Sequence, residues 1–276
     1  MAAGFVEQYG PWALIAGASE GIGLEFADQL AAQGLNLVLL SRSQAKLDKA
    51  RQALLDKHGI EVRTIAADLT SAGFIEEVAS STADIEVGTM IYNAGAVHQA
   101  EYFLDRPVDE WLGLVDLNCR GPVLLAHHFG KAMRDRKRGG MIFLSSMTSL
   151  GGGSYMATYA ATKAFDVILP QSLWHELKPD NVHVLCLIAG ATRTPAMADA
   201  GLDLSEEQEG GPAIMDAADV ASEGLANLGN GPVWIPGEGN RATMEMLKDV
   251  PRADLVEALS LSTAELFGKP HRSVMS

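Results

Sequence analysis

Two tyrosines and a lysine recur at intervals of four residues in the stretch SYMATYAATKAF, as Tyr155, Tyr159 and Lys163. Four residues of an α-helix advance the chain by about 400°, so the three side chains would lie along one helix face. A phenol beside an ammonium group can exchange a proton with a substrate oxygen, because the positive charge favours the phenolate. The same triplet also suits an ordinary amphipathic helix with aromatic core residues and a solvated lysine. The choice between these interpretations depends on the rest of the chain.

A glycine-rich turn, AGASEGIG, follows the first apolar run of the chain. Gly17, Gly21 and Gly23 would let the backbone approach a pyrophosphate closely, and the N-terminus of a following helix would supply N–H donors. The spacing is GxxxGxG, which differs from the standard GxGxxG fingerprint, and the Gly-Lys-Ser/Thr of a P-loop is missing. Taken alone, the motif fits a purely structural turn equally well.

Short apolar runs alternate with longer amphipathic stretches along the chain. The runs that predict strands cover residues 12–18, 35–42, 62–68, 89–95, 140–146, 182–190 and 232–237. The stretches that predict helices include residues 22–33, 43–58, 108–133, 155–177, 242–250 and 253–268. Apolar strands joined by helical crossovers are typical of a parallel sheet covered on both faces. We therefore predict an α/β fold: a single doubly wound, Rossmann-type domain of about seven parallel strands, with ligands bound at their carboxyl ends.

The composition excludes several classes of protein. Of the 276 residues, 47% are hydrophobic and 20% are charged, which is enough apolar material for a large core. The formal net charge of -14 would repel nucleic acids and anionic lipid surfaces, so neither is expected as a partner. The uncharged stretch 139–162 is long enough to cross a bilayer, but its many Gly, Ser and Thr residues favour a buried strand and loop.

The cysteines and the N-terminus indicate a cytoplasmic protein. Cys119 and Cys186 form no CxxC motif and have no His-Cys ligand spacing, so we expect buried thiols in a reducing compartment, without a disulfide or a metal site. The first residues, MAAGFVEQYGPW, lack the basic and apolar segments of a secretory signal.

Six motifs, in this order, make the chain similar to the short-chain dehydrogenase/reductase family. They are the glycine motif, the YNAG of residues 92–95, Asn118 in VDLN, Ser146, the YxxxK of Tyr159 and Lys163, and Thr194 in AGATRT. Ser146 lies 13 residues before Tyr159, which is the interval usual in the family. The resemblance covers about residues 10–240. It implies that Asn118, Ser146, Tyr159 and Lys163 form the catalytic group.

The resemblance implies hydride transfer between a nicotinamide and a carbonyl carbon, with Tyr159 as the general acid and base. Lys163 would supply the positive charge that favours the phenolate, and Ser146 would hold the carbonyl oxygen. Asn118 would hold a water that links Lys163 to solvent. Tyr155 is followed four residues later by a tyrosine and no cation, so we expect it to pack in the core or to line the substrate pocket.

Cofactor choice is expected at the end of the second strand. Ser41 stands where NAD-preferring relatives carry an acid, and the guanidinium of Arg42 suits a 2′-phosphate, which favours NADP over NAD. Glu20 in the glycine loop argues mildly against NADP, and Asp68 could contact adenine or cap a helix. The full set of expected cofactor residues is Gly17, Ser19, Gly21, Ile22, Gly23, Ser41, Arg42, Asp68, Leu69, Asn93, Ala94, Gly95, Tyr159, Lys163, Gly190, Thr192 and Thr194.

Substrate contacts are expected from two parts of the chain. The candidate residues are Ser146, Tyr155, Tyr159 and Met197. Residues 1–240 would form the catalytic domain, with a lid at about 195–216. Residues 241–276 would form a helical extension of the same domain, on the substrate side or at a subunit interface. This extension, the start of the chain and the SSMT after the fifth strand are similar to those of bacterial hydroxysteroid dehydrogenases of the 7β type.

Three residues depart from the family pattern. Ala16 replaces the threonine that ties the glycine loop to the neighbouring strand, Tyr92 replaces the first asparagine of NNAG, and Ala189 replaces a proline. None of these changes removes a catalytic group.

The sequence therefore predicts an NADP-preferring oxidoreductase that interconverts a secondary alcohol and a ketone on a small apolar substrate such as a hydroxysteroid, as a homodimer or homotetramer. One alternative is a 3-oxoacyl-thioester reductase. The net negative charge of the chain argues against it, because it would repel the phosphate group of the carrier that bears such a substrate. The other is a dinucleotide-binding sensor or scaffold without turnover.

Overall fold

A parallel sheet of seven strands forms the centre of the computed structural model, which describes residues 2–95, 100–202 and 214–270. The strand order is β3-β2-β1-β4-β5-β6-β9. The strands are β1 (Trp12–Ala16), β2 (Asn36–Ser41), β3 (Val62–Ala66), β4 (Val87–Tyr92), β5 (Gly139–Ser146), β6 (Val182–Ala189) and β9 (Val233–Trp234). The doubly wound fold predicted from the alternating runs is confirmed, with a last strand shorter than the apolar run 232–237 suggested.

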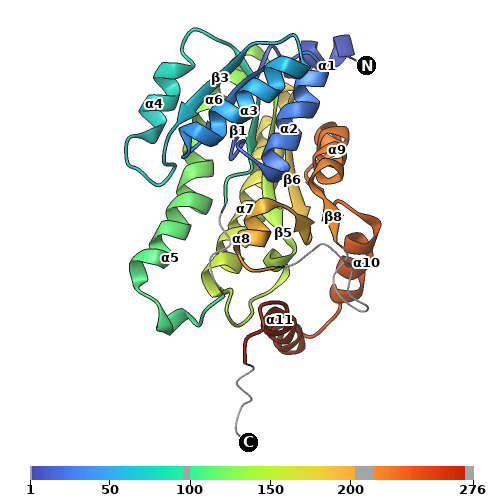
Figure 1. Ribbon diagram of the computed structural model, residues 1–276. Coiled ribbons are helices and arrows are strands. Elements are labelled where there is room, and N and C mark those ends of the chain that lie inside the picture. The colour runs from blue at the N-terminus through green and yellow to red at the C-terminus, as the bar shows by residue number, and fades with distance from the viewer. Residues whose placement is uncertain (1, 96–99, 203–213, 271–276) are drawn as a thin grey trace, which may run out of the picture.

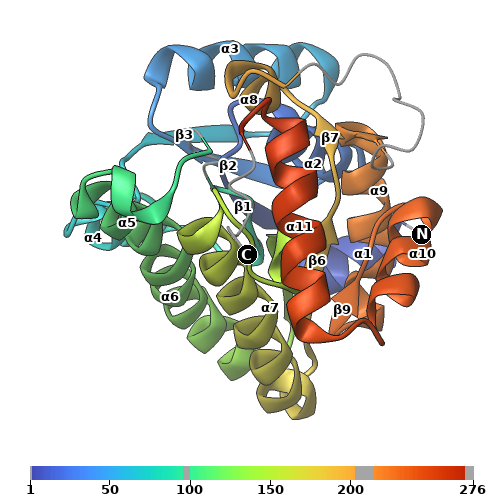
Figure 2. The same cartoon turned by 90° about the horizontal axis from the view of Figure 1, so that it is seen from below.

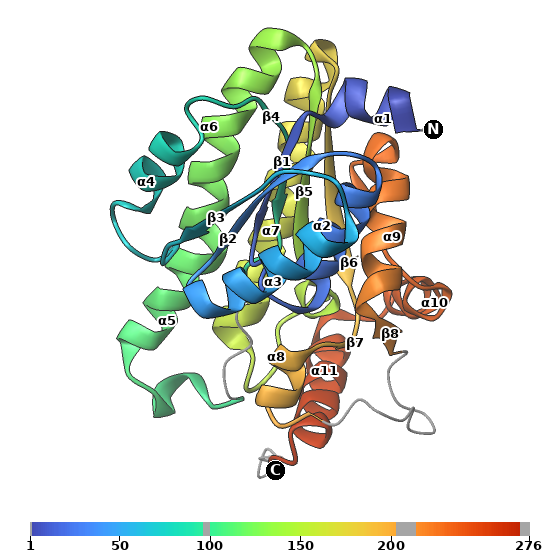
Figure 3. The same ribbon diagram turned by 45° about the horizontal axis from the view of Figure 1, so that its top comes forward.

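Helices cover both faces of the sheet (Figure 3). One face carries α1 (Ala2–Tyr9), α2 (Gly21–Ala32), α3 (Gln44–Lys57) and α9 (Ala217–Asn227), and the other carries α4 (Phe74–Ser81), α6 (Gly121–Arg136) and α7 (Ala157–Leu177). Successive strand residues face opposite sides: Ile15 joins the core that contains Phe26, and Leu14 joins the core that contains Phe129. Helix α1 was not predicted. None of the helices described is long and apolar enough to span a bilayer.

The continuous helix predicted for residues 108–133 is interrupted. Helix α5 (Val108–Val115) is followed by a π-helical turn at Asp116–Arg120 before α6 begins. Pro122 has no N–H to bond the carbonyl of Asn118 four residues earlier, and the N–H of Gly121 bonds the carbonyl of Asp116, five residues earlier. The turn places the Asn118 side chain fully inside the protein.

The predicted helix 155–177 begins two residues later than expected, at Ala157. Tyr155 lies in the preceding turn with a φ of 69°, a value that a right-handed helix excludes. The prediction that all three side chains of the Tyr-Tyr-Lys triplet share one helix face is therefore wrong for Tyr155. Only Tyr159 and Lys163 lie on the same face of α7.

The last part of the chain gathers at the carboxyl ends of the strands (Figure 1). It comprises α8 (Pro195–Asp199), α10 (Glu238–Leu247), α11 (Arg252–Leu266) and a small parallel pair of strands, β7 (Thr192–Arg193) and β8 (Met215–Asp216). Seen from this end, α11 crosses in front of the sheet between α7 and α10 (Figure 2). Helices α10 and α11 correspond to the two predicted for the C-terminal extension. Of the predicted lid, residues 203–213 lie outside the described part of the chain.

Candidate active site

The glycine loop between β1 and α2 is shaped by close backbone contacts. Gly17 and Gly21 have φ angles of 82° and 56°, a region that favours glycine. A Cβ atom at Gly23 would lie 2.0 Å from the carbonyl oxygen of Gly17, so no larger residue fits there. Gly23 therefore allows the close packing of helix α2 against the loop, but it does not line the cavity next to the loop. Gly17 and Gly21 do line that cavity.

Two of the departures from the family pattern have structural substitutes. With Ala16 in place of the threonine, the glycine loop is held by the Asn93 amide, whose Nδ2 donates to the Gly17 carbonyl at 2.9 Å. The Tyr92 hydroxyl donates to the carbonyl of Leu117 in the turn that carries Asn118. Gly121 leaves room for this ring, because a Cβ atom there would lie 2.2 Å from the Tyr92 oxygen. Both the loop and the turn are thus tied to β4 or its end.

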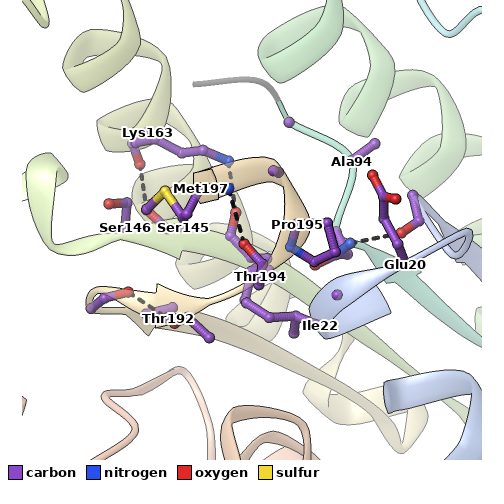
Figure 4. A pocket seen from close by; sticks show the side chains of 18 of the residues that line it. Glu20, Ile22, Ala94, Ser145, Ser146, Lys163, Thr192, Thr194, Pro195 and Met197 are labelled. Atoms are coloured by element: carbon purple, nitrogen blue, oxygen red, sulfur yellow. Dashed lines mark hydrogen bonds between the residues drawn. The ribbon is translucent and has the colours of Figure 1, made fainter. Parts of the chain in front are cut away.

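A cavity of about 250 Å³ opens at the carboxyl ends of β1, β4, β5 and β6 (Figure 4). Ser146 from the end of β5 and Tyr159 and Lys163 from α7 line one side of it, whereas the glycine loop and α8 line the others. The expected site residues that line it are Gly17, Ser19, Gly21, Ile22, Asn93, Ala94, Gly95, Ser146, Tyr159, Lys163, Gly190, Thr192, Thr194 and Met197. Motifs spread over about 180 residues of sequence therefore meet at one place.

Asn118 lies behind this wall. Its Nδ2 donates to Thr162 Oγ1 at 2.9 Å, and its Oδ1 has no hydrogen-bond partner among the described residues. A Cβ atom on Gly95 would lie 3.6 Å from Asn118 Oδ1 and 3.3 Å from Lys163 Nζ, so these two polar atoms face the same spot. This placement suits the proton relay that the family resemblance implies for Asn118.

The Lys163 ammonium is held by two acceptors. Its Nζ donates to the Leu144 carbonyl at 2.9 Å and to Asp166 Oδ2 at 3.0 Å, and it lies 5.9 Å from the centre of the Tyr159 ring. Only 4% of the residue is exposed. The interpretation of Lys163 as a solvated lysine on an amphipathic helix is therefore wrong.

A second cavity, of about 140 Å³, adjoins the first and shares Gly17, Ala94 and Gly95 with it. It is lined by four more of the expected cofactor residues: Ser41, Arg42, Asp68 and Leu69. Arg42 is exposed and makes no hydrogen bond or ion pair within the described part of the chain. Two adjoining cavities with a glycine loop at their junction and a cation in one of them suit an elongated ligand with a pyrophosphate at its middle.

Hydrogen bonds also fix the loops around the second cavity. Ser41 Oγ donates to Ser19 Oγ at 3.0 Å, which joins the end of β2 to the glycine loop. Asp68 Oδ1 accepts from the N–H and the hydroxyl of Thr70, and these two bonds hold the pKa of Asp68 below its usual value. Asp68 therefore caps its own turn and lies at the edge of the cavity, instead of capping a helix.

Glu20 is paired with a lysine of α3. Its carboxylate lies 2.8 Å from Lys46 Nζ, on the first turn of α3. The hydrogen bond and the charge of Glu20 raise the pKa of Lys46. The negative charge that Glu20 brings to the glycine loop is therefore partly offset by a neighbouring cation.

Residues after β6 close the opposite side of the cavity. Thr194 Oγ1 accepts from the N–H of Met197 and so caps the first turn of α8, while Thr192 Oγ1 donates to the Gly190 carbonyl. Gly190 packs against Asn240: a Cβ atom at Gly190 would lie 2.4 Å from Asn240 Oδ1. Both threonines are therefore held in place at the cavity wall, as expected of cofactor residues.

Tyr155 does not line either cavity. Its ring centre lies 4.3 Å from that of Tyr102, its hydroxyl donates to the carbonyl of Pro270, and the same hydroxyl is hydrogen-bonded to the Tyr102 hydroxyl at 2.8 Å. Only 4% of the residue is exposed. Of the two expectations for Tyr155, the structure favours packing, because the residue lines neither cavity and its contacts are with Tyr102 and the C-terminal segment.

Two polar residues of the site were missed. Ser145 lines the cavity and donates to the Lys163 carbonyl at 2.7 Å, and Asp166 pairs with the Lys163 ammonium. Asp166 could have been found from the sequence. An acid three residues after Lys163 lies on the same helix face as Lys163, and the YxxxK motif predicts that this face points into the protein. Ser145 had no such signal, because any small residue fits next to the strand-end serine.

Comparisons with known proteins agree with this geometry. A family model described as short chain dehydrogenase matches residues 11–204. A 7beta-hydroxysteroid dehydrogenase of Clostridium sardiniense is 29% identical over 255 residues, which are 92% of this chain and 96% of that protein. A very-long-chain 3-oxoacyl-CoA reductase of Podospora anserina is 36% identical over 184 residues, which are 65% of this chain and 54% of that protein.

Two solved structures are also similar. A structure from work on 7beta-hydroxysteroid dehydrogenase stereoselectivity has a TM-score of 0.85 and 25% identity, and covers 92% of this chain and 98% of its own. A short-chain dehydrogenase from Sphingobium yanoikuyae in complex with NADPH has a TM-score of 0.75 and 28% identity, and covers 88% of this chain and 97% of its own. The resemblance inferred from the motifs is therefore confirmed, and the chain belongs to the short-chain dehydrogenase/reductase family of enzymes.

Proposed function

We propose that the chain is an NADP-preferring oxidoreductase that interconverts a secondary alcohol and a ketone on an apolar, hydroxysteroid-like substrate. The observation that carries the proposal is the placement of Ser146, Tyr159 and Lys163 on one wall of the larger cavity. A hydroxyl, a phenol and an ammonium group at one cavity wall are the groups needed to bind and protonate a carbonyl oxygen.

The residues around both cavities fit a dinucleotide. The glycine loop and the N-terminus of α2 suit the pyrophosphate, and the exposed Arg42 suits a 2′-phosphate. The ion pair between Glu20 and Lys46 weakens the one argument against NADP. When bound, the dinucleotide supplies the hydride for ketone reduction or accepts it from the alcohol. The Sphingobium yanoikuyae relative, which binds NADPH, supports the same choice.

The proton chemistry follows from the hydrogen bonds of the wall. Ser146 Oγ accepts from the N–H of Thr148 at 3.2 Å, which leaves its O–H to donate to a substrate oxygen. In the direction of reduction, the Tyr159 phenol gives its proton to that oxygen as negative charge develops on it. The Lys163 ammonium, 5.9 Å from the ring centre, then stabilises the phenolate that remains.

The substrate class rests on the similarity to the hydroxysteroid enzymes and on the last part of the chain. The similarity to the Clostridium sardiniense enzyme extends over 92% of this chain, whereas that to the 3-oxoacyl-CoA reductase extends over 65%. We propose that residues 241–276 are an extension of the one domain and that they form the substrate side of the site. Support comes from the contact of α11 with the loop after β5, where Ser260 Oγ accepts from the N–H of Ser154 at 2.9 Å.

The proposal is tested with a panel of steroid, aryl and aliphatic ketones and a 3-oxoacyl thioester, each with NADPH and with NADH. We expect the highest kcat/KM for a steroid ketone with NADPH, with Tyr159→Phe as the inactive control. A thioester turned over faster than every ketone would favour the reductase alternative. Tight NADPH binding without turnover of any compound would favour the non-catalytic alternative.

We also propose that the protein is a cytoplasmic homo-oligomer. Apolar side chains are exposed along α5, α6 and α7: Val108, Leu112, Val115, Val123 and Ile168. Exposed apolar side chains on helices are typical of a contact between copies. Cys186 is buried as expected, whereas Cys119 is only partly buried, and both are free thiols, in keeping with a reducing compartment. Light scattering of the purified protein distinguishes a dimer or tetramer from a monomer.

A further inference from the structure

Asp166 is a buried carboxylate that none of the motifs explains. It lies on α7 one turn after Lys163, and only 1% of the residue is exposed. Its Oδ2 lies 3.0 Å from Lys163 Nζ, and its Oδ1 has no hydrogen-bond partner among the described residues. Burial raises the pKa of Asp166, and the charge and hydrogen bond of Lys163 oppose that rise. A buried carboxylate with a free oxygen is therefore costly to keep charged, and its pairing with Lys163 points to a role in the site.

The surroundings of Lys163 suggest that role. Besides Asp166, the only acceptor of its ammonium in the described structure is the Leu144 carbonyl, so one of its three N–H groups remains for the cavity. Burial would lower the pKa of Lys163, but the charges of Asp166 and Tyr159 and the hydrogen bond to Asp166 outweigh this, and the pKa lies above its ordinary value. Without the carboxylate, burial would favour a neutral amine.

We propose that Asp166 is a positioning residue, whose carboxylate keeps the Lys163 ammonium charged and seated beside Tyr159 before any cofactor binds. The inference rests on the proposed function, because the charge of Lys163 matters only if Tyr159 exchanges a proton with substrate. The carboxylate also moderates the effect of the Lys163 charge on the Tyr159 phenol, because this ammonium is already paired with a negative group.

Three other titratable groups near Asp166 have raised pKa values. Burial raises the pKa of the Cys119 thiol to about 11 and that of the Cys186 thiol to about 12. Burial also raises the pKa of Tyr92 well above its usual value. The charge of Asp166 adds to each of these shifts, so a titration signal from Lys163 itself is needed to separate the effect on the lysine from effects on these groups.

The sign of the effect follows from the charge that is removed. Asp166→Asn keeps the shape of the side chain and an acceptor oxygen for Lys163, but removes the negative charge. The Lys163 ammonium then loses its proton at a lower pH than in the unchanged protein. We expect its titration midpoint to fall by at least one pH unit, and turnover to decline at alkaline pH where the unchanged enzyme keeps its activity.

Two measurements test the inference. The first follows Lys163 by NMR of the cofactor-free, lysine-labelled protein during a pH titration, with Lys163→Met to assign its signal. The second compares the pH profiles of kcat and kcat/KM in both reaction directions. Asp28→Asn is the matched control, because Asp28 pairs with Lys57 at 2.7 Å and His58 at 2.9 Å but lines neither cavity.

The outcomes separate a positioning role from a structural one. Asp166→Glu restores a carboxylate and should recover part of the lysine titration, whereas Asp28→Asn should leave both measurements unchanged. Should Asp166→Asn be too unstable to titrate, Asp166→Ser removes the same charge with a smaller side chain. Equal Lys163 midpoints in the variant and the unchanged protein would overturn the inference. The NMR result decides this even if no ketone is turned over, which would contradict only the proposed function.

Discussion

The cavity wall that carries Tyr159 and the cluster of side chains around Tyr155 are built differently. The motif wall, made by the glycine loop, β5 and α7, depends on local backbone requirements, such as the Gly23 position that leaves no room for a Cβ atom. The C-terminal cluster around Tyr155, which lines neither cavity, depends on contacts between distant segments: Ser154 bonds Ser260, 106 residues later, and Lys269 bonds Glu101, 168 residues earlier. Short motifs therefore specify the motif wall, and only the folded chain specifies the C-terminal cluster.

The contrast is greatest between two tyrosines four residues apart. Tyr159 belongs to α7 and lines the cavity, whereas Tyr155 precedes the helix and is held by Tyr102 and the C-terminal segment. If the motif wall performs the chemistry and the C-terminal cluster only supports the fold beside it, substitutions in the two regions should differ in what they change as well as in how much.

The largest effect is expected for Tyr159→Phe. It removes the proton donor and leaves the ring to pack, so the protein should fold and bind NADP normally. Turnover should fall by at least 10²–10⁴-fold, roughly 3–5 kcal/mol in the barrier, as is typical of losing a general acid or base. Lys163→Ala should be similarly severe and should also weaken cofactor binding. Steady-state kinetics check both, and near-normal kcat in Tyr159→Phe would place the chemistry elsewhere.

An intermediate effect is expected for Arg42→Ala in the second cavity. A charge-assisted contact with a 2′-phosphate is worth about 1.5–3 kcal/mol, or roughly ten- to a hundredfold in affinity. The ratio of kcat/KM for NADPH to that for NADH should fall by this factor, with little change for NADH. Lys46→Ala is the control, because it removes a neighbouring cation whose partner is Glu20. An unchanged ratio in Arg42→Ala would show that another residue selects the cofactor.

The smallest effect on chemistry is expected for Tyr155→Phe. It removes the hydrogen bonds to Tyr102 and to the Pro270 carbonyl, so the free energy of unfolding should fall by about 1–3 kcal/mol while kcat changes less than about threefold. Tyr102→Phe leaves the bond between Tyr155 and the Pro270 carbonyl in place and should therefore have a smaller effect on thermal unfolding. A Tyr155→Phe enzyme that is inactive would break the distinction between the two regions. A raised KM with kcat kept would show that the C-terminal cluster contacts substrate.

Much of the motif wall could be predicted because its requirements are local. Ser146, Tyr159 and Lys163 lie at or near the carboxyl ends of strands, where the alternation of apolar runs and helices places them. The spacing of the glycines reflects close backbone contacts, which are visible in a few consecutive residues. The sheet itself followed from seven apolar runs with helical crossovers between them.

The remaining features depend on contacts that spacing alone does not show. Tyr155 lies in a turn with a positive φ, which the four-residue spacing of the triplet does not reveal. The turn is fixed by Tyr102 and Pro270, which lie some 50 and 115 residues away in the sequence. The break before α6 could have been predicted from Pro122, which cannot donate to the carbonyl of Asn118. Asp166 was overlooked because an acid within an amphipathic helical pattern is usually solvated.

The short pair of β7 and β8 has a consequence for how such an enzyme can change. Thr192 pairs with Met215 and Arg193 with Asp216, and an ion pair of 3.1 Å joins the last two. The chain therefore leaves β7 and re-enters β8 at adjacent positions. Doubling the length of a segment closed in this way costs only about 0.6 kcal/mol of extra closure entropy. Changes in chain length after α8 should therefore cost little and leave the parallel sheet undisturbed, while Thr194 and Met197 keep their places at the cavity wall.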